Sequence, residues 1–187
     1  QDTQILPRQE PVIYSDITPE SALTADQADQ FEANGFLVVP GLFQAEEVAE
    51  YVAELDRIRA DKVLLAKDEA ITERSSGELR SLFQVHQSHD LFASVAKDPR
   101  IANIARCILG GDVYIHQSRL NFKPGLHGKE FFWHSDFETW HVEDGMPKMR
   151  AISCSVLLTD NTPENGALML MPGTHKHFLP CIGRTPA

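Results

Sequence analysis

The sequence lacks any apolar run long enough to cross a bilayer. The longest apolar stretches, such as residues 151–158, are interrupted by serine and fall far short of the roughly 20 residues that a membrane helix needs. The first four residues carry neither the basic start nor the apolar core of a signal peptide. We therefore expect a soluble, cytoplasmic protein that does not bind membranes.

Cysteine and positive charge are also scarce. The three cysteines, Cys107, Cys154 and Cys181, are odd in number and widely spaced, which matches neither a disulfide framework nor a zinc motif. Unpaired thiols in a reducing cytoplasm are the expected state. A formal net charge of −10 argues against general affinity for nucleic acid.

Helical signals are concentrated in the first 110 of the 187 residues. Thr24 followed by Gln27 is a capping-box pattern, and it predicts a helix that ends near Gly35. Residues 44–66 place apolar side chains at helical spacing, with acids early and bases late, as the helix dipole favours. Residues 98–109 predict another helix, which begins Asp-Pro and ends at a glycine pair.

The remaining segments favour extended structure. Residues 1–20 contain three prolines and little periodicity, which predicts an extended arm, and residues 69–78 are polar enough for a loop. Alternating or apolar runs predict strands at 36–39, 113–123, 151–159 and 168–171. Helices followed by strands indicate an α+β fold with a β-rich second half.

His134 and Asp136 are the most informative pair. With one residue between them, both side chains would lie on the same side of a strand and could bind one divalent metal. A further histidine would complete the two-His, one-carboxylate site of Fe(II) oxygenases, which leaves positions open for an organic acid and oxygen. Neighbouring aromatic residues could exclude water from that site: Phe132, Trp133, Phe137 and Trp140. The alternative is a strand with one paired histidine and a solvated aspartate.

A second group of polar residues occupies alternate positions, and therefore one face, of the predicted strand 113–123. Gln117, Arg119, Asn121 and Lys123 could form the solvent side of a sheet or line a polar pocket. A pocket that binds a dicarboxylate needs a cation and amide donors, which Lys123 and Asn121 would supply.

Other candidates are weaker. Trp140 is either a core residue or a surface that stacks on a flat or cationic ligand. His175 and His177 are candidates for the missing metal ligand, but surface histidines in a turn are the favoured interpretation. His141 and the acids after it are expected in a loop. The other histidines have no partner spacing and receive no role: His86, His89, His116 and His127.

Longer motifs carry a resemblance to a known family. The segments that carry it are 11–15, 115–119, 121–125, 128–131, 133–147, 165–166 and 172–173. Together they resemble the ectoine hydroxylase branch of the phytanoyl-CoA dioxygenase-like Fe(II)/2-oxoglutarate oxygenases, over nearly the whole chain. The stretch 133–145 is far more distinctive than the His-x-Asp triplet alone.

The resemblance implies a double-stranded β-helix (jelly-roll, cupin-like) core with N-terminal helices packed outside it. It also implies a reaction in which ectoine, 2-oxoglutarate and O2 give 5-hydroxyectoine, succinate and CO2. His134 and Asp136 would bind Fe(II), and Lys123 would bind 2-oxoglutarate with Asn121 as a second contact. Gln117 and Trp140 would bind ectoine.

One departure from the family pattern qualifies this reading. Members of the family complete the iron site with a later histidine, followed by an arginine that binds 2-oxoglutarate, and residues 1–187 end before either would appear. We therefore expect one oxygenase domain over 1–187, incomplete at its C-terminus: 1–110 as arm and helices, and 111–187 as the first part of the jelly roll. This chain alone would bind iron weakly and be inactive. A hydroxylase of another small substrate and a non-enzymatic metal-binding jelly roll are the alternatives, and a homodimer is left open.

Overall fold

The structure is a computed structural model that describes residues 4–73, 76–122 and 133–178. Its described helices are α1 (Ala25–Asn34), α2 (Ala45–Ala60), α3 (Lys62–Leu65), α4 (Val85–Ser88), α5 (Asp90–Ala96), α6 (Pro99–Leu109) and α7 (Asp136–Glu143), with short 3-10 turns at Pro163–Asn165 and Thr174–Lys176. Its described strands are β1 (Leu6–Pro7), β2 (Ala70–Thr72), β3 (Leu79–Phe83), β4 (Arg119–Asn121) and β5 (His177–Phe178). The α+β prediction is confirmed. None of the helices in these ranges is long and apolar enough to cross a membrane.

The predicted helix ends of α1 and α6 are confirmed. The Thr24 side chain accepts a hydrogen bond from the Gln27 amide while Gln27 reaches back to the Thr24 amide, which is a complete capping box. Gly35 ends α1 with φ of 81°, and a Cβ there would also overlap the His175 ring. The Asp98 side chain accepts from the Arg100 amide at the start of α6.

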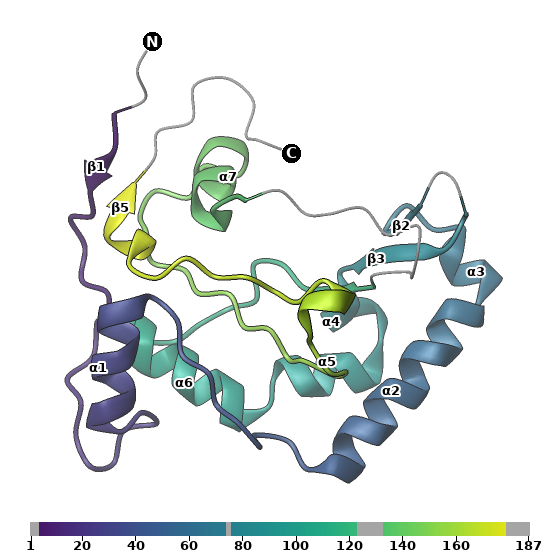
Figure 1. Ribbon diagram of the computed structural model, residues 1–187, viewed down its shortest axis with the longest axis horizontal. Helices are drawn as coiled ribbons and strands as arrows, with labels where there is room; N and C mark the ends of the chain where they lie inside the picture. Colours follow the sequence, from purple (N-terminus) through teal and green to yellow (C-terminus); the bar gives the residue numbers. More distant parts are fainter. Residues whose placement is uncertain (1–3, 74–75, 123–132, 179–187) are drawn as a thin grey trace.

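The long helix predicted over 44–66 is divided. It breaks at Asp61, which has extended backbone and caps α3 by accepting from the Val63 and Leu64 amides. An aspartate that satisfies the free amides of a new helix start competes with continuation of the old helix. Figure 1 shows α2 and α3 meeting at this break.

Two small antiparallel sheets are formed. The order β2-β3-β4 puts β3 in the centre, with Leu82 opposite both Ala70 and Leu120. The loop predicted at 69–78 is therefore wrong for β2. The other sheet joins the two ends of the described chain, since Leu6 of β1 pairs with Phe178 of β5. Figure 1 shows these two strands side by side, on the other side of the molecule from β2 and β3.

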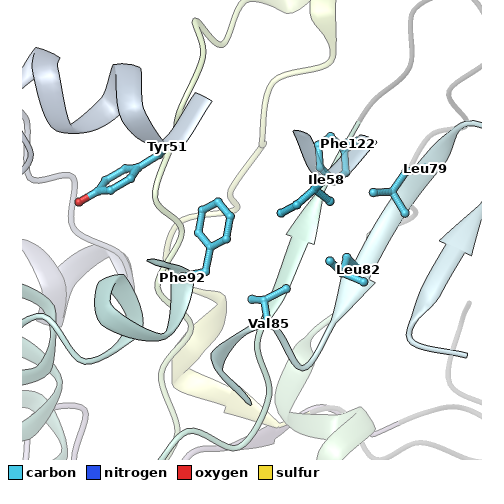
Figure 2. Packing of buried hydrophobic residues seen from close by; sticks show 7 residues of the cluster. All are labelled: Tyr51, Ile58, Leu79, Leu82, Val85, Phe92 and Phe122. Atoms are coloured by element: carbon cyan, nitrogen blue, oxygen red, sulfur yellow. The ribbon is translucent and has the colours of Figure 1, made fainter. Parts of the chain in front are cut away.

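The hydrophobic core lies between α2, α5 and the three-stranded sheet. Figure 2 shows its buried members, Tyr51, Ile58, Leu79, Leu82, Val85, Phe92 and Phe122. Leu120 of β4 packs against this cluster, and Phe122 follows just after the strand on the same parity. The buried members of this core therefore come from residues 51–92 and from Phe122, and Leu158 packs against them from the second half of the chain.

Several predicted strands are wrong for the described residues. Segment 113–123 is a strand only at β4, and 36–39, 151–159 and 168–171 have no strand assignment. A strand needs a hydrogen-bonded neighbour, and in the described part of the chain these segments have none. Leu157 and Leu168 to Met171 are accordingly exposed.

The N-terminal arm crosses the molecule to reach late parts of the chain. The Arg8 amide donates to the Lys176 carbonyl at 2.8 Å, and the Arg8 guanidinium donates to the Met149 carbonyl at 2.6 Å. Tyr14 continues the arm past α6, where its amide donates to the Ile108 carbonyl. The extended arm predicted over 1–20 is confirmed for its described part.

Candidate metal centre

His134 and Asp136 converge at the start of α7, not on a strand. Ser135 is the N-cap with extended backbone, and Asp136 is the first helical residue. An acidic residue is favourable in the first turn because the helix dipole is positive there. The extended cap carries His134 back toward Asp136, so that His134 Nε2 lies 3.4 Å from Asp136 Oδ1. The predicted convergence is confirmed, whereas the predicted strand is wrong.

The donor atoms of this pair fit a shared metal ion. Two adjacent ligands with bonds of about 2.1 Å at right angles stand about 3 Å apart, close to the 3.4 Å of His134 and Asp136. Both side chains are about one third exposed, with 36% for each. Imidazole with carboxylate is a donor set that Fe(II) accepts.

Ser153 contacts the second oxygen of the same carboxylate. Its hydroxyl donates to Asp136 Oδ2 at 2.7 Å from a segment 17 residues later in the chain. Asp136 therefore offers its two oxygens to different neighbours, Oδ1 to His134 and Oδ2 to Ser153. This separation of roles is the most specific feature of the site.

No third ligand joins the pair within the ranges that the structure describes. His175 lies at the end of α1, where its Nε2 is 3.0 Å from the Glu32 carbonyl, and burial lowers the pKa of its ring. His177 belongs to β5 and pairs with Pro7. Neither histidine completes the metal centre in this structure.

The aromatic residues around the pair do not form the predicted common wall. Phe137 stacks on His141 with ring centres 5.6 Å apart, and both rings pack against Phe178 of β5. Trp133 is exposed. Phe132 lies outside the described residues. The rings instead fix one side of α7 against the sheet formed with the N-terminal arm, and this sheet lies beside α7 in Figure 1.

Trp140 of α7 has different ring contacts from Phe137. Its ring makes an edge-to-face contact with His116 at 5.3 Å, and His116 Nε2 lies 3.0 Å from Asp144 Oδ2. Its carbonyl accepts from the amides of Asp144 and Met146, which closes the helix. Trp140 is thus held one turn beyond Asp136 by backbone and side-chain contacts. His141 and Glu143 are helical, so their predicted loop is wrong.

The other predicted contacts lie on or next to β4, or outside the described residues. Gln117 is exposed just before β4, and Asn121 on β4 accepts a hydrogen bond from the Ser81 hydroxyl at 2.9 Å. Lys123 lies outside the described residues. Gln117, Arg119 and Asn121 lie on the exposed face of this segment, because Leu120 and Phe122 face the core. β4 therefore alternates between exposed and partly buried residues, as both a solvent face and a polar pocket require.

Two contact residues were not assigned a role from the sequence. Ser153 is a polar residue inside the apolar run 151–158, and that interruption was the available signal. His116 had no ligand spacing, and its contact with Trp140 joins residues 24 positions apart. Such pairings depend on the tertiary fold.

Comparisons with known proteins show which proteins the chain resembles. Residues 31–184 match the family described as phytanoyl-CoA dioxygenase (PhyH). An ectoine dioxygenase of Stutzerimonas stutzeri is 56% identical over 179 residues, which are 96% of this chain and 59% of that protein. An ectoine dioxygenase of Sphingopyxis alaskensis is 50% identical over 185 residues, 99% of this chain and 60% of that protein. The chain spans about three fifths of the length of these curated relatives.

Solved structures show the same similarity in three dimensions. EctD from S. alaskensis with bound Fe has a TM-score of 0.94 at 49% identity, covering 99% of this chain and 66% of that one. EctD with 2-oxoglutarate and 5-hydroxyectoine has a TM-score of 0.93 at 49% identity, covering 96% and 64%. With the family match and identities near one half over almost all of its residues, the chain belongs to the phytanoyl-CoA dioxygenase family.

Proposed function

We propose that the protein is an Fe(II)- and 2-oxoglutarate-dependent dioxygenase that hydroxylates ectoine. The observation that carries the proposal is the approach of His134 Nε2 to Asp136 Oδ1, 3.4 Å apart. Ectoine, 2-oxoglutarate and O2 would give 5-hydroxyectoine, succinate and CO2, in which one oxygen atom enters the product and the other enters succinate. The similarity to EctD with 2-oxoglutarate and 5-hydroxyectoine supports this substrate assignment.

His134 and Asp136 hold the metal in this proposal. Bound Fe(II) supplies the oxidative chemistry that couples decarboxylation of 2-oxoglutarate to hydroxylation. The protein's own contribution at this point is placement, because the first turn of α7 fixes Asp136 while the extended Ser135 returns His134 toward it.

Trp140 and Gln117 bind ectoine, and Lys123 with Asn121 binds 2-oxoglutarate. An indole face attracts a cationic ring, and ectoine carries a cationic amidine ring. Trp140 suits this role because His116 contacts it edge to face and its backbone is fixed at the end of α7. The Asn121 amide oxygen is engaged by Ser81, so the amide NH2 is the group it offers to a carboxylate.

The fold that completes this site is a double-stranded β-helix. The exposed apolar residues Leu157 and Leu168 to Met171 support it, because they lie on extended segments that further strands would cover. In this proposal residues 1–187 lie in a single oxygenase domain of a cytoplasmic enzyme.

The test uses the full encoded protein under anaerobic conditions. Addition of Fe(II) and 2-oxoglutarate should give a chelate absorption band, and admission of O2 with ectoine should give equal amounts of succinate and 5-hydroxyectoine. His134→Ala should lose both signals. A metal-binding protein without activity would give no chelate band, and a hydroxylase of another substrate would give the band but no ectoine-dependent succinate.

A further inference from the structure

We infer that Ser153 is a positioning residue that keeps Asp136 a one-oxygen ligand. The inference rests on the proposed function, because it concerns how Asp136 binds the metal. Asp136 Oδ1 is directed to His134 Nε2 at 3.4 Å, whereas Oδ2 accepts the Ser153 hydroxyl at 2.7 Å. A hydroxyl-to-carboxylate hydrogen bond of this length is strong, since the acceptor is charged.

The hydrogen bond decides how many metal positions the carboxylate occupies. An aspartate can bind a cation through one oxygen or through both. To bind through both, Asp136 would have to turn Oδ2 away from Ser153. One-oxygen binding leaves an additional position on the metal, and an oxygenase needs open positions for its co-substrate and for O2.

Ser153 is presented by a segment that is anchored independently of α7. Three residues earlier, the Arg150 guanidinium donates to the Leu109 carbonyl at 2.8 Å and lies 4.6 Å from the centre of the Tyr14 ring. The end of α6 is negative, so a cation is stabilised there. The hydroxyl therefore reaches Asp136 from a segment tied to α6 and to the N-terminal arm.

A serine on an exposed segment could also merely solvate an exposed carboxylate. Both Ser153 and the site are accessible to water, so the burial of Ser153 does not argue for its role. The two readings differ in what removal of the hydroxyl does to the metal. Loss of a solvating group leaves the ligand arrangement unchanged, whereas loss of a positioning group changes it.

The test compares Ser153→Ala and Ser153→Thr in the full encoded protein. Co(II) replaces Fe(II) because its absorption spectrum reports coordination number and geometry, and binding is followed anaerobically with and without 2-oxoglutarate. Loss of a group that orients a ligand typically weakens metal binding about 10–100-fold, and we expect this for Ser153→Ala together with an altered cobalt spectrum. Ser153→Thr, which keeps the hydroxyl, should have the metal affinity and the cobalt spectrum of the unchanged protein.

Two controls keep the outcomes separate. Ser94→Ala removes a hydroxyl that donates to the Leu91 carbonyl on α5, and it should leave the cobalt spectrum unchanged. The thermal unfolding midpoint of metal-free Ser153→Ala should equal that of the unchanged protein. A cobalt spectrum of Ser153→Ala identical to the unchanged protein, failure of threonine to restore it, or a lowered metal-free midpoint overturns the inference. Failure of the unchanged protein to bind Co(II) in a His134-dependent manner refutes the proposed function instead.

Discussion

Trp140→Ala should weaken the use of ectoine while leaving the metal bound. The substitution removes the indole, but the carbonyl of residue 140 still accepts from the Asp144 and Met146 amides, so α7 keeps its end. Alanine is also a better helix former than tryptophan, so no loss of helix is expected.

The size of the effect follows from the contact that is lost. A cationic ring over an indole gains about 0.5 to 2 kcal/mol, depending on how far the pair is removed from water. At about 1.4 kcal/mol for each factor of ten, this predicts a rise in the KM for ectoine of about 2- to 30-fold. Trp140 is only partly buried, so the lower half of that range is expected.

The assay measures the KM for ectoine, the KM for 2-oxoglutarate and the affinity for Fe(II) in one preparation. The matched control is Tyr114→Ala, which removes an exposed aromatic ring from the neighbourhood of His116, 6.4 Å from the His116 ring. Trp140→Ala should change only the KM for ectoine, and Tyr114→Ala should change none of the three. Equal losses of iron and ectoine binding, or equal effects of the two substitutions, would show that Trp140 acts through the local structure.

Further predictions concern the metal, the core and acid stability. His134→Ala or Asp136→Ala should abolish iron-dependent succinate formation, and undiminished turnover in either variant would refute the metal assignment. Ile58→Ala should lower the free energy of unfolding by about 2–5 kcal/mol in urea titrations, because Ile58 is only 2% exposed within the core; a change below 1 kcal/mol would contradict that packing. The hydrogen bond from Arg100 holds the pKa of Glu47 at about 2 instead of 4.5, so its stabilisation is present above pH 4.5 and is lost as the pH falls toward 2. Glu47→Gln should flatten the dependence of the urea midpoint on pH in that window, and an unchanged slope would show that the ion pair is broken in solution.

Local signals in the sequence predicted α1, α2 and α6, whereas α4, α5 and α7 were not predicted and most predicted strands were wrong. The caps Thr24 and Asp98 and the glycine ends of α1 and α6 act over three or four residues, so their outcome does not depend on distant partners. The Arg119–Asn121 strand depends on β3, which lies about 40 residues earlier. Alternation alone cannot specify where such a partner will stand.

The metal pair was predicted for a reason that was only half correct. On a strand, residues two apart lie on the same face. At a helix start, residues two apart also come together when the residue between them is an extended N-cap. The signal for the helix was present, because Ser135 followed by Glu138 is a capping-box spacing. The role of Ser153 could not be predicted, since its distance from Asp136 is set by the fold and not by spacing.

The pairing of β1 with β5 determines the order in which parts of the site fold. Arg8 binds a carbonyl 141 residues later, and Leu6 pairs with Phe178. During synthesis the arm is made before its partners, which follow 141 or more residues later, so it must stay undocked while the core around Ile58 forms. Phe137, beside the metal ligand Asp136, finds its own aromatic partner on β5 only at that late stage. A ribosome-bound nascent chain that stops before residue 178 should therefore contain a packed helical half and an arm still open to proteases.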